Sequence, residues 1–565
     1  MQPGRQDLIA WKAAKSTDYF ATIPDFEQVL ELRMGRTLPE SLREKLVAFG
    51  EVVATQIDPA VTVLEHNREF PKLRPYDEFG QHIDEIEFHP AHGDAASAAW
   101  RSGMLATKLD FEGAFQLAAQ FLLLSYIGEG GQACPIVCTI GMRRALEHHA
   151  STELKDRYLS LLANADASQA LRGSQFLTEV QGGSDVGANV VEAFPDPDIP
   201  GAWRISGEKW FCSVADADLF AVTARPASSG PGTKGLACFV IPRLLDGMTP
   251  NGFRLRRLKD KLGTRALASG EIDFENALAW PIGELGDGFK IAVSELLNTS
   301  RWLNAVGSVG IMCRSYLEAS SFARHRTAFG VAISTFPAVR EQLVIMKSEM
   351  VAALASTFAL TELVARIDEG TATSADVAVH RFLVNANKYV TSVAASDVVH
   401  RAIEVLGGNG TIEDFSPLPR LYRDAVVFES WEGTHNVLCA QVQRDCVRLG
   451  LLDNVAQWVK DELTSVGAHD DSVVVIEHAT EALRPGLERS LADQPYADAN
   501  FRRHLTTLMD IIQATCLLRE VETSSSAEKS ALTQVFIGRH LRAQSQFEEP
   551  GWYPFIRDAL GADVL

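Results

Sequence analysis

The sequence has no surplus of basic residues to offer a nucleic acid. Its 565 residues include 53 Lys and Arg against 73 Asp and Glu, so the formal net charge is −20. An acidic surface repels phosphate backbones. Nucleic acid is therefore an unexpected partner unless basic side chains gather locally.

Cysteine is scarce and dispersed, with eight residues in the whole chain. This density excludes a disulfide-stapled scaffold. Cys134 and Cys138 lie four residues apart with no second pair nearby, which is a weak metal signal. We therefore expect no metal site, and buried, reduced thiols in a cytoplasmic protein.

Long apolar runs are missing as well. The longest largely apolar stretch, Phe121–Ile127, is far shorter than the roughly 20 residues that span a bilayer. The first residues, MQPGRQDLIAWKAAKSTDYF, lack the apolar run of a signal peptide. We expect a protein that does not bind a membrane.

The remaining composition, 46% hydrophobic and 22% charged, is that of a folded globular protein. Apolar residues at helical spacing predict an N-terminal helical domain over 1–170, with a hairpin-like insertion near 73–93. Short apolar runs between turn residues predict a central β-domain over 171–285. Long periodic stretches predict a helical bundle over 286–450 and a helical C-terminal extension over 451–565. The expected fold is α+β and mainly α, with a barrel-like β-domain.

Glycine and proline predict where some helices end. The Gly407-Gly408 pair is expected to end a long helix, because a helix C-terminus favours a left-handed residue. In the extension, we expect interruptions at Pro485, Pro495 and a Ser524–Ser526 turn.

Two segments of the β-domain carry candidate binding groups. In Leu177–Asp185 (LTEVQGGSD), consecutive glycines let backbone amides approach a ligand, and the hydroxyls of Thr178 and Ser184 lie beside them. In Ser206–Ser213 (SGEKWFCS), an aromatic residue and a hydroxyl on a predicted strand suit a flat heterocycle. Taken singly, the first is equally typical of a tight turn and the second of a strand core.

Three segments of the helical region carry further candidates. Arg324–Gly330 (RHRTAFG) places arginines that suit a pyrophosphate at a helix end, although a basic helix C-terminus is the simpler reading. Glu404–Gly410 (EVLGGNG) exposes backbone amides or merely caps a helix. Glu432, between Trp431 and Gly433, suits a partly desolvated general base, although a lone Glu is usually solvated.

In this order and context, the five segments resemble those of the acyl-CoA dehydrogenase family. TEVQGGSDV is similar to the family's TE-x-x-x-GSD loop, SGEKWFCS to its second flavin strand, and RHRTAFG to its R-x-x-FG signature. LGGNG and RDA…WEGT resemble its C-terminal signatures. The resemblance implies an N-terminal α-domain, a central β-domain, a C-terminal four-helix bundle and non-covalently bound FAD. Family members are dimers or tetramers in which a neighbouring subunit helps to hold the FAD adenosine.

Carried over by position, the resemblance implies a set of cofactor-binding residues: Phe176, Leu177, Thr178, Gly183, Ser184, Phe211, Ser213, Arg326, Phe329, Ile333, Phe336, Glu404, Gly408, Thr434 and Asn436. It places Arg326 and Phe329 at the FAD of the partner subunit. Glu404 replaces the usual Gln, which puts a carboxylate near phosphates. The implied substrate-binding residues are Ser184, Arg301, Trp431 and Gly433.

The resemblance also makes Glu432 the catalytic base, which removes the α-proton of an acyl-CoA thioester while a hydride leaves the β-carbon for the flavin. Trp431 then excludes water and raises the pKa of Glu432. Some family members place the base just before an Arg that matches Arg301. That position is Ser300, which cannot serve, and Arg301 either positions CoA or braces its helix.

Residues 73–93, residues 257–280 and the C-terminal extension resemble the AidB-like branch of the family. Two functions follow: a metabolic acyl-CoA dehydrogenase yielding a trans-2-enoyl-CoA, or a DNA-associated flavoprotein of the alkylation response. Residues 451–565 hold 10 Lys and Arg against 18 Asp and Glu, which opposes DNA binding. The one adjacent basic pair there, Arg502-Arg503, is read as a solvated helix face.

The family resemblance further implies fatty acid metabolism, electron-transfer flavoprotein as acceptor, and a homotetramer, with a dimer as the alternative. A flavin oxidase or monooxygenase that uses O₂ is a third reading, which the retained Glu432 disfavours. Acyl chain length is not readable from the sequence.

Overall fold

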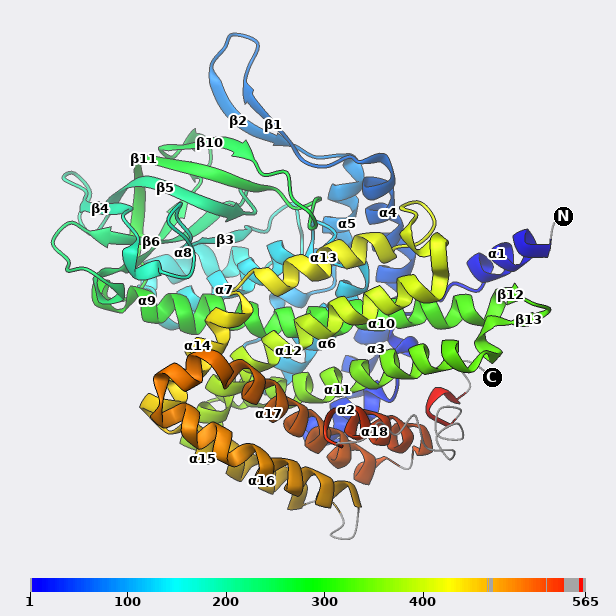
Figure 1. Ribbon diagram of the computed structural model, residues 1–565. Coiled ribbons are helices and arrows are strands. Elements are labelled where there is room, and N and C mark those ends of the chain that lie inside the picture. The colour runs from blue at the N-terminus through cyan, green and yellow to red at the C-terminus, as the bar shows by residue number, and fades with distance from the viewer. Residues whose placement is uncertain (1–2, 465, 467–470, 525, 543–557, 562–565) are drawn as a thin grey trace. The chain divides into compact units, whose positions relative to one another are not determined.

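The computed structural model describes residues 3–464, 466, 471–524, 526–542 and 558–561. The chain forms two compact units, each assembled from separate stretches of sequence (Figure 1). The strand unit comprises residues 55–107 and 128–303, and the helical unit comprises residues 1–54, 108–127 and 304–565. Each unit combines stretches from more than one of the four consecutive domains that the sequence predicts. The division into four domains stays a prediction.

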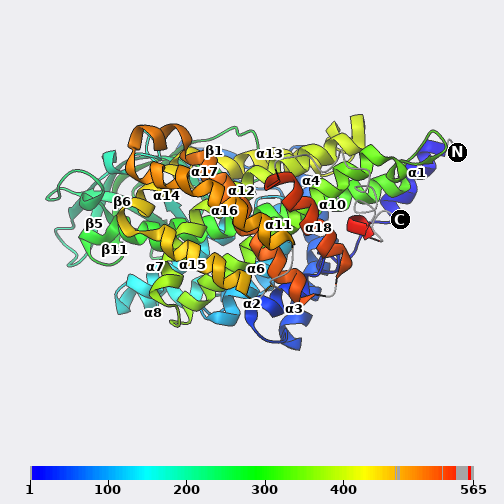
Figure 2. The same ribbon diagram turned by 60° about the horizontal axis from the view of Figure 1, so that its bottom comes forward.

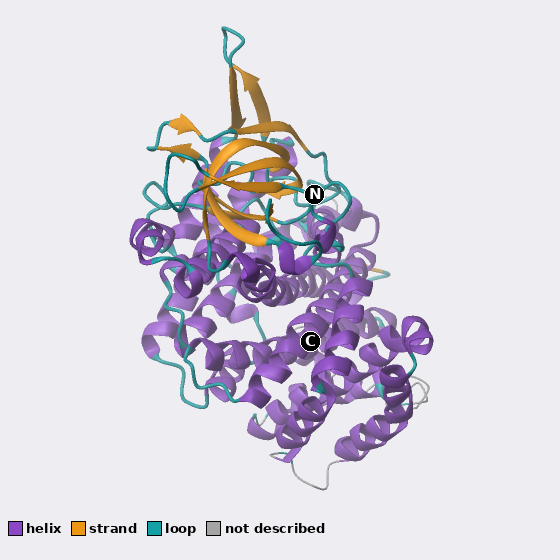
Figure 3. Ribbon diagram, turned by 90° about the vertical axis from the view of Figure 1, so that its left-hand side faces the viewer, coloured by secondary structure: helices purple, strands orange, loops and turns teal. Residues whose placement is uncertain are grey.

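A seven-stranded sheet forms the centre of the strand unit (Figure 3). Its strands are β3 (Gly173–Phe176), β4 (Glu192–Pro195), β5 (Trp203–Ser213), β6 (Leu219–Pro226), β7 (Ala237–Pro242), β10 (Phe253–Leu258) and β11 (Ser269–Pro281). Strand β11 pairs with β5, β5 with β4, β4 with β6, β6 with β7, and β7 with β11 again. The ladder therefore closes on itself, which confirms the barrel-like β-domain. All six residues of β7 are buried, as expected of an inner apolar strand.

A hairpin of β1 (Lys72–Tyr76) and β2 (His82–Glu87) confirms the predicted insertion. The two strands are antiparallel, with Lys72 opposite Glu87. The Asp84 carboxylate accepts a hydrogen bond from the backbone N–H of Leu255 on β10, at 3.1 Å. The short strands β8 (Leu244–Leu245) and β9 (Thr249–Pro250) form a second ribbon.

Helices of the strand unit include α4 (Asp58–Asn67), α5 (Pro90–Arg101), α7 (Ala133–His149), α8 (Thr152–Leu162) and α9 (Gly288–Ile291). Helix α7 packs against β3. At the contact, a Cβ on Gly173 would lie 2.7 Å from the Cβ of Met142, so only glycine permits this approach. A π-helix, Ala292–Leu297, follows α9.

The helical unit is built from long helices (Figure 2). They are α1 (Pro3–Ala13), α2 (Phe26–Met34), α3 (Glu40–Val52), α6 (Phe111–Leu124), α10 (Asn298–His325, which begins in the strand unit), α11 (Pro337–Asp368), α12 (Ser374–Leu406), α13 (Leu418–Ser430) and α14 (His435–Leu449). The extension adds α15 (Leu451–Thr464), α16 (Asp471–Ala492), α17 (Gln494–Thr523) and α18 (Ala527–His540). Helix α11 packs against α12, α6 and α17, so it forms the centre of this unit.

Two helical stretches are long and apolar enough to cross a bilayer by length and composition alone, Glu40–Asn67 and Pro337–Asp368. The apolar window of the second is 94% buried inside the protein, as in the core helix of a bundle, and that of the first is 39% buried. Neither stretch was predicted from the sequence, because both contain polar residues and neither is a continuous apolar run.

Helix ends follow the predicted signals in part. Helix α12 begins with a capping box between Thr373 and Asp376. It ends at Gly407, as predicted, where a positive φ of 62° favours glycine, although the ψ of −142° is not that of a left-handed helical residue. Pro485 does not end a helix, contrary to the prediction, because α16 continues through it and packs on α17. Helix α17 begins at Gln494 with Pro495 in its first turn, so a helix boundary does lie at this proline. Ser525 of the predicted turn lies outside the described residues.

All eight cysteines are buried, as expected, and none of them forms a disulfide. Four lie in each unit. Burial raises the pKa of Cys439 to about 11 and that of Cys238, Cys313, Cys446 and Cys516 to about 12. These thiols are therefore protonated at neutral pH.

Candidate functional site

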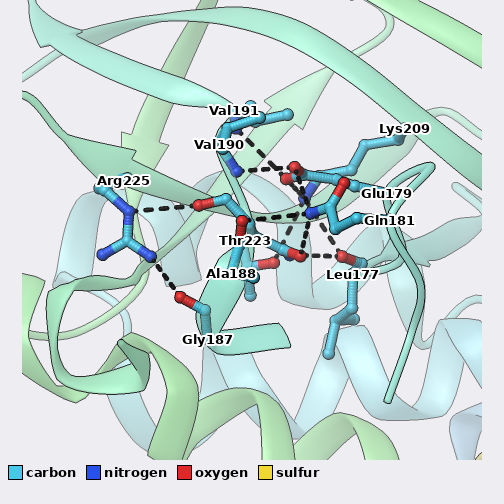
Figure 4. A network of polar contacts seen from close by, with 11 residues as sticks. Leu177, Glu179, Gln181, Gly187, Ala188, Val190, Val191, Lys209, Thr223 and Arg225 are labelled. Atoms are coloured by element: carbon cyan, nitrogen blue, oxygen red, sulfur yellow. Dashed lines mark hydrogen bonds and ion pairs between the residues drawn. The ribbon is translucent and has the colours of Figure 1, made fainter. Parts of the chain in front are cut away.

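The loop that follows β3, residues 177–191, is held by one buried carboxylate (Figure 4). Glu179 is 1% exposed, and its Oε1 lies 2.8 Å from Nζ of the equally buried Lys209 on β5. Its Oε2 accepts the backbone N–H of Val190 at 2.7 Å. Burial raises the pKa of a carboxyl group, but Lys209 and these hydrogen bonds outweigh it and hold the pKa of Glu179 below its usual value. The loop is therefore closed around an ion pair.

The far end of the same loop is fixed by an amide and a guanidinium. Asn189 donates from Nδ2 to the carbonyl of Leu177 at 2.7 Å. Arg225 on β6 donates to the carbonyls of Asn189 and Gly187, at 3.2 and 2.9 Å. The 177–191 loop thus has both ends tied to the sheet.

The glycine turn of this loop presents polar groups to the outside. Gly182 has φ of 129°, and its N–H donates to the carbonyl of Glu179 at 2.9 Å. A Cβ on Gly183 would lie 2.6 Å from the hydroxyl oxygen of Thr178, so this glycine is required for the packing. Ser184 is exposed and Thr178 half-buried. The exposed Ser184 is thus open to solvent, and the role of this turn in binding a ligand stays a prediction.

Strand β5 lies directly beside this turn. The N–H of Trp210 donates to the carbonyl of Thr178 at 2.9 Å, which joins the two predicted flavin segments. Phe211 is 55% exposed, and Nζ of Lys259 lies 4.7 Å from its ring centroid. The hydroxyl of Ser213 lies 3.1 Å from that of Ser269 on β11.

Three predicted residues of the strand unit, Phe176, Leu177 and Arg301, are buried. Phe176 is 0% exposed and packs its ring against Phe220, so any part that it plays at a ligand runs through its backbone. Arg301 is 4% exposed, which fits a helix-bracing role better than contact with CoA. Its neighbour Ser300 accepts a hydrogen bond from the amide of Gln175 at 2.9 Å.

The turn between α13 and α14, residues 430–434, carries Glu432 and is called the base loop here. Glu432 has φ of 57° and Gly433 φ of 106°. A left-handed conformation costs a non-glycine residue about 1–2 kcal/mol. Such strain persists where surrounding groups determine the backbone and is found at functional sites.

A buried cation fixes both ends of the base loop. Nζ of Lys388, on α12, donates to the carbonyls of Glu429 and Gly433, each at 3.1 Å. Lys388 is 0% exposed. Because charge-assisted hydrogen bonds are strong, this lysine sets the width of the turn.

Aromatic packing supports the same loop. The rings of Trp431 and Phe428 lie 4.7 Å apart, and Asn304 on α10 donates to the carbonyl of Phe428 at 3.2 Å. Among the described residues, the buried indole N–H of Trp431 has no hydrogen-bond partner. A buried donor without an acceptor is costly, so this atom suits a ligand oxygen.

Beside the base loop, Glu429 accepts hydrogen bonds from Ser396 and from Nε2 of His435, the latter at 2.8 Å. Burial raises the pKa of Glu429, but these hydrogen bonds and the charge of Lys388 outweigh it, so the pKa falls below the usual value. Glu429 is therefore ionised and structural, and Glu432 is the carboxylate on the turn itself.

Thr434 and Asn436 stand at the start of α14 and both are exposed. Thr434 is the N-cap residue, but its hydroxyl makes no capping hydrogen bond. The Asn436 Oδ1 accepts a hydrogen bond from Nη1 of Arg502, on α17, at 3.0 Å. Arg502 and Arg503 are both exposed, as the prediction of a solvated helix face requires, and Arg502 makes this contact in addition.

Other predicted cofactor residues lie on two exposed features of the helical unit. A hairpin of β12 (Thr327–Ala328) and β13 (Val331–Ala332) has Phe329 at its tip, 97% exposed with φ of 54°. The half-buried Arg326, Ile333 and Phe336 flank it, and the rings of Phe336 and Phe329 lie 6.2 Å apart. Glu404 and Gly408 are exposed at the end of α12, and a Cβ on Gly408 would meet no atom within 4 Å.

Models of known families match along the chain. The acyl-CoA dehydrogenase middle domain matches residues 174–277, and the acyl-CoA dehydrogenase C-terminal domain matches residues 286–446. The N-terminal domain of the adaptive response protein AidB matches residues 14–166. AidB of Escherichia coli (strain K12) is 35% identical over 386 residues, which cover 66% of this chain and 69% of AidB. The chain belongs to the acyl-CoA dehydrogenase family.

Solved structures agree with this membership. ACDH-11 of Caenorhabditis elegans, in complex with C11-CoA, aligns with a TM-score of 0.85 and 25% identity over 95% of this chain and 93% of that chain. An acyl-CoA dehydrogenase from Bacillus anthracis complexed with FAD aligns with a TM-score of 0.72 at 19% identity, over 96% and 90% of the two chains, and shows the shared fold. The predicted resemblance to the AidB-like branch is confirmed by the match to the AidB N-terminal domain and by the identity with AidB.

Three cations of this acyl-CoA dehydrogenase were not among the predicted site residues. They are Lys209, Lys388 and Arg502, which hold the 177–191 loop and the base loop. Neither Lys209, which follows Glu208, nor Lys388, which follows Asn387, is marked by its sequence neighbours as a buried cation. A lysine is buried only with partners, and those partners lie far away in the sequence.

The sequence predicts no metal site. In the described part of the strand unit, however, three side chains, His148, His149 and Glu295, lie close enough together to be possible metal ligands. The carboxylate of Glu295 lies 3.0 Å from Nδ1 of His148 and 3.2 Å from Nε2 of His149. Nε of Arg144 lies 3.8 Å from the same carboxylate. Burial opposes ionisation, but the hydrogen bond from His148 and the charge of Arg144 lower the pKa of Glu295 to about 2. The arginine already supplies the charge that a metal ion would bring.

Proposed function

We propose that this chain is an FAD-dependent acyl-CoA dehydrogenase that converts an acyl-CoA thioester to the trans-2-enoyl-CoA. Membership of the family supports the reaction class, an oxidoreductase acting on CH–CH groups. ACDH-11, which is bound to C11-CoA in its structure, supports an acyl-CoA substrate. The observation that supports the proposal is the strained turn at Glu432, next to Trp431, at the sequence position where the resemblance implies the base.

The groups present fit FAD in each unit taken separately. In the strand unit, the glycine turn with Thr178 and Ser184 lies beside the exposed ring of Phe211, which suits a flat, polar-edged ring. In the helical unit, the indole N–H of Trp431 has no partner among the described residues and suits a ligand oxygen. The remaining cofactor residues implied by the resemblance stay predictions.

In this mechanism the Glu432 carboxylate takes the proton from the α-carbon of the thioester. Trp431 and Phe428 form an aromatic surface beside the turn, which keeps water from the carboxylate and favours proton transfer near neutral pH. Lys388 holds the turn in place while the charge moves. FAD, when bound, supplies the hydride acceptor.

The test is dye-linked turnover over a panel of acyl-CoA thioesters, with Glu432→Gln as the variant. A missing general base lowers turnover by about 10²–10⁴-fold. We expect Glu432→Gln to lose at least about 10³-fold while it keeps its yellow cofactor. Glu488→Gln, on an exposed face of α16, is the matched control and retains activity. Full turnover by Glu432→Gln would show that another group is the base.

The setting of the enzyme is part of the proposal. The exposed Phe329 at the hairpin tip supports contact with a partner subunit, and we favour a homotetramer over a dimer. Electron-transfer flavoprotein as the acceptor and a place in fatty acid metabolism follow from the family resemblance, and a cytoplasmic location is proposed from the reduced cysteines that the sequence predicts. Size-exclusion chromatography with light scattering tests the oligomeric state.

A DNA-associated flavoprotein is the second candidate, because the N-terminal region matches the AidB domain. The acidic extension opposes it, and Arg502 is engaged with Asn436. A gel shift with duplex DNA at increasing salt decides the question. Binding that weakens steeply with salt would favour this candidate.

A further inference from the structure

The C-terminal extension touches the start of α14 through one arginine. Nε of Arg502, on α17, donates to the hydroxyl of Tyr389 at 3.1 Å, and Nη1 donates to Oδ1 of Asn436 at 3.0 Å. The guanidinium lies 5.3 Å from the centroid of the Tyr389 ring, within range of a cation–π interaction. Asn436 is only four residues beyond Glu432.

Tyr389 carries the contact to the other end of the base loop. It is 5% exposed, and its hydroxyl lies 2.9 Å from that of Thr506, also on α17. Its ring centroid lies 5.1 Å from that of His435, which bonds to Glu429 at 2.8 Å. Residues on both sides of the turn are therefore linked to α17.

Helix α17 is a rigid support for these contacts. Phe501, Leu505 and Met509 on this helix are 3%, 0% and 0% exposed, so the helix is anchored by its apolar face. Among the described ion pairs, none joins Arg502 to a carboxylate, so its hydrogen bonds go to the hydroxyl and the amide. A group positioned from a packed helix is held more closely than one positioned from a loop.

We propose that α17 braces the base loop and that Arg502 is a positioning residue for Glu432. This inference rests on the proposed function, in which Glu432 is the base. The left-handed backbone at Glu432 needs neighbours that determine it, and Arg502 supplies one through Asn436 and one through Tyr389. Because Arg502 donates to Oδ1 of Asn436, it also fixes the orientation of this amide.

The test compares Arg502→Gln with Arg503→Gln in the full-length holoenzyme. Both substitutions remove one positive charge from the same exposed turn of α17, but only the first removes the two contacts. We expect Arg502→Gln to lower kcat about tenfold with KM changed less than twofold, and Arg503→Gln to leave both within twofold. The acidic limb of the kcat–pH profile should shift in Arg502→Gln only. Arg502→Lys, which keeps the charge and one donor, should recover part of kcat.

Hydrogen exchange of the peptide that spans residues 427–438 gives a readout that does not depend on turnover. We expect exchange to rise about tenfold in Arg502→Gln and to stay unchanged in Arg503→Gln. Tyr389→Phe, which keeps the ring and removes the acceptor, serves if Arg502→Gln folds poorly, and it should raise exchange in the same peptide. Equal exchange and equal kcat in Arg502→Gln and Arg503→Gln would overturn the brace.

The brace and the proposed function fail in different ways. If Glu432→Gln keeps full turnover, the function of Glu432 is wrong, whatever Arg502 does. If Glu432→Gln is inactive but Arg502→Gln matches Arg503→Gln in kcat, pH profile and exchange, the base assignment stands and the brace is wrong.

Discussion

The 177–191 loop and the base loop are both turns that hold a carboxylate, but they are stabilised from different distances along the chain. Glu179 and Asn189 are bonded to Lys209 and Arg225, which are 30 and 36 residues away. The base loop is held by groups 41 to 124 residues away, on α12, α17 and α10. The first loop is therefore a product of neighbouring strands, whereas the second depends on the packing of a whole bundle.

The largest effect is expected where one buried charge would lose its partner. Lys209→Met leaves Glu179 buried without its cation, which costs about 3–5 kcal/mol in proteins. We expect this loss in the free energy of unfolding of the strand unit, measured by urea denaturation. Lys234→Met, at an exposed lysine of the same unit, is the control. A loss below about 1 kcal/mol would mean that the backbone amides alone hold the loop.

The base loop should respond to Lys388→Met with a smaller loss of stability and a larger loss of activity. The substitution removes charge-assisted hydrogen bonds to two carbonyls, which costs about 2–3 kcal/mol. We expect turnover to fall while the cofactor stays bound. Urea denaturation and dye-linked turnover measure the two effects, and Lys460→Met on the exposed side of α15 is the control. Unchanged turnover would separate Lys388 from the chemistry.

The sequence distance between each loop and the groups that hold it also explains what could be predicted from the sequence. Thr178, Ser184 and Phe211 were predicted together because two contiguous motifs carry them, and the structure places those motifs side by side. Glu432 was predicted from the family resemblance of its Trp-Glu-Gly segment, whereas its left-handed turn was not predicted. Helical periodicity shows which face is buried but not which helix it meets, so the contacts of Lys388 and Arg502 with this turn were not predicted.

Packing also explains the element that was misread. Pro485 removes one backbone hydrogen bond, which normally ends a helix. Next to it, a Cβ on Gly486 would lie 2.6 Å from the ring of His504, so α16 and α17 are in close contact here. This tertiary contact keeps the helix continuous, and no local signal in the sequence reports it.

A third prediction concerns the close approach in the 177–191 loop. Gly183→Ala brings a methyl group within 2.6 Å of the Thr178 hydroxyl, and overpacking of this kind costs about 1–2 kcal/mol. We expect this loss of stability together with weaker retention of FAD, read from absorbance after gel filtration. Gly230→Ala, where a Cβ meets no atom within 4 Å, is the matched control. If both variants retain FAD equally, the turn has room to relax.

The smallest effect is a dependence on pH. The folded-state pKa of Glu429 lies below its unfolded value, so its contribution to stability is present above the unfolded pKa and is lost as pH falls through the folded one. We expect Glu429→Gln to lower stability by about 1 kcal/mol at neutral pH and to flatten its decline below about pH 4.5. Thermal unfolding over a pH series measures this. A decline of unchanged steepness would assign it to other carboxylates.

The buried cysteines allow the opening of the two units to be measured separately. A protonated, enclosed sulfur does not react with an alkylating reagent until the structure around it opens. Since each unit contains four buried cysteines, peptide mapping after brief exposure to a maleimide would count the openings of each unit separately. The protein thus carries its own unfolding reporters, with no label to be engineered into it.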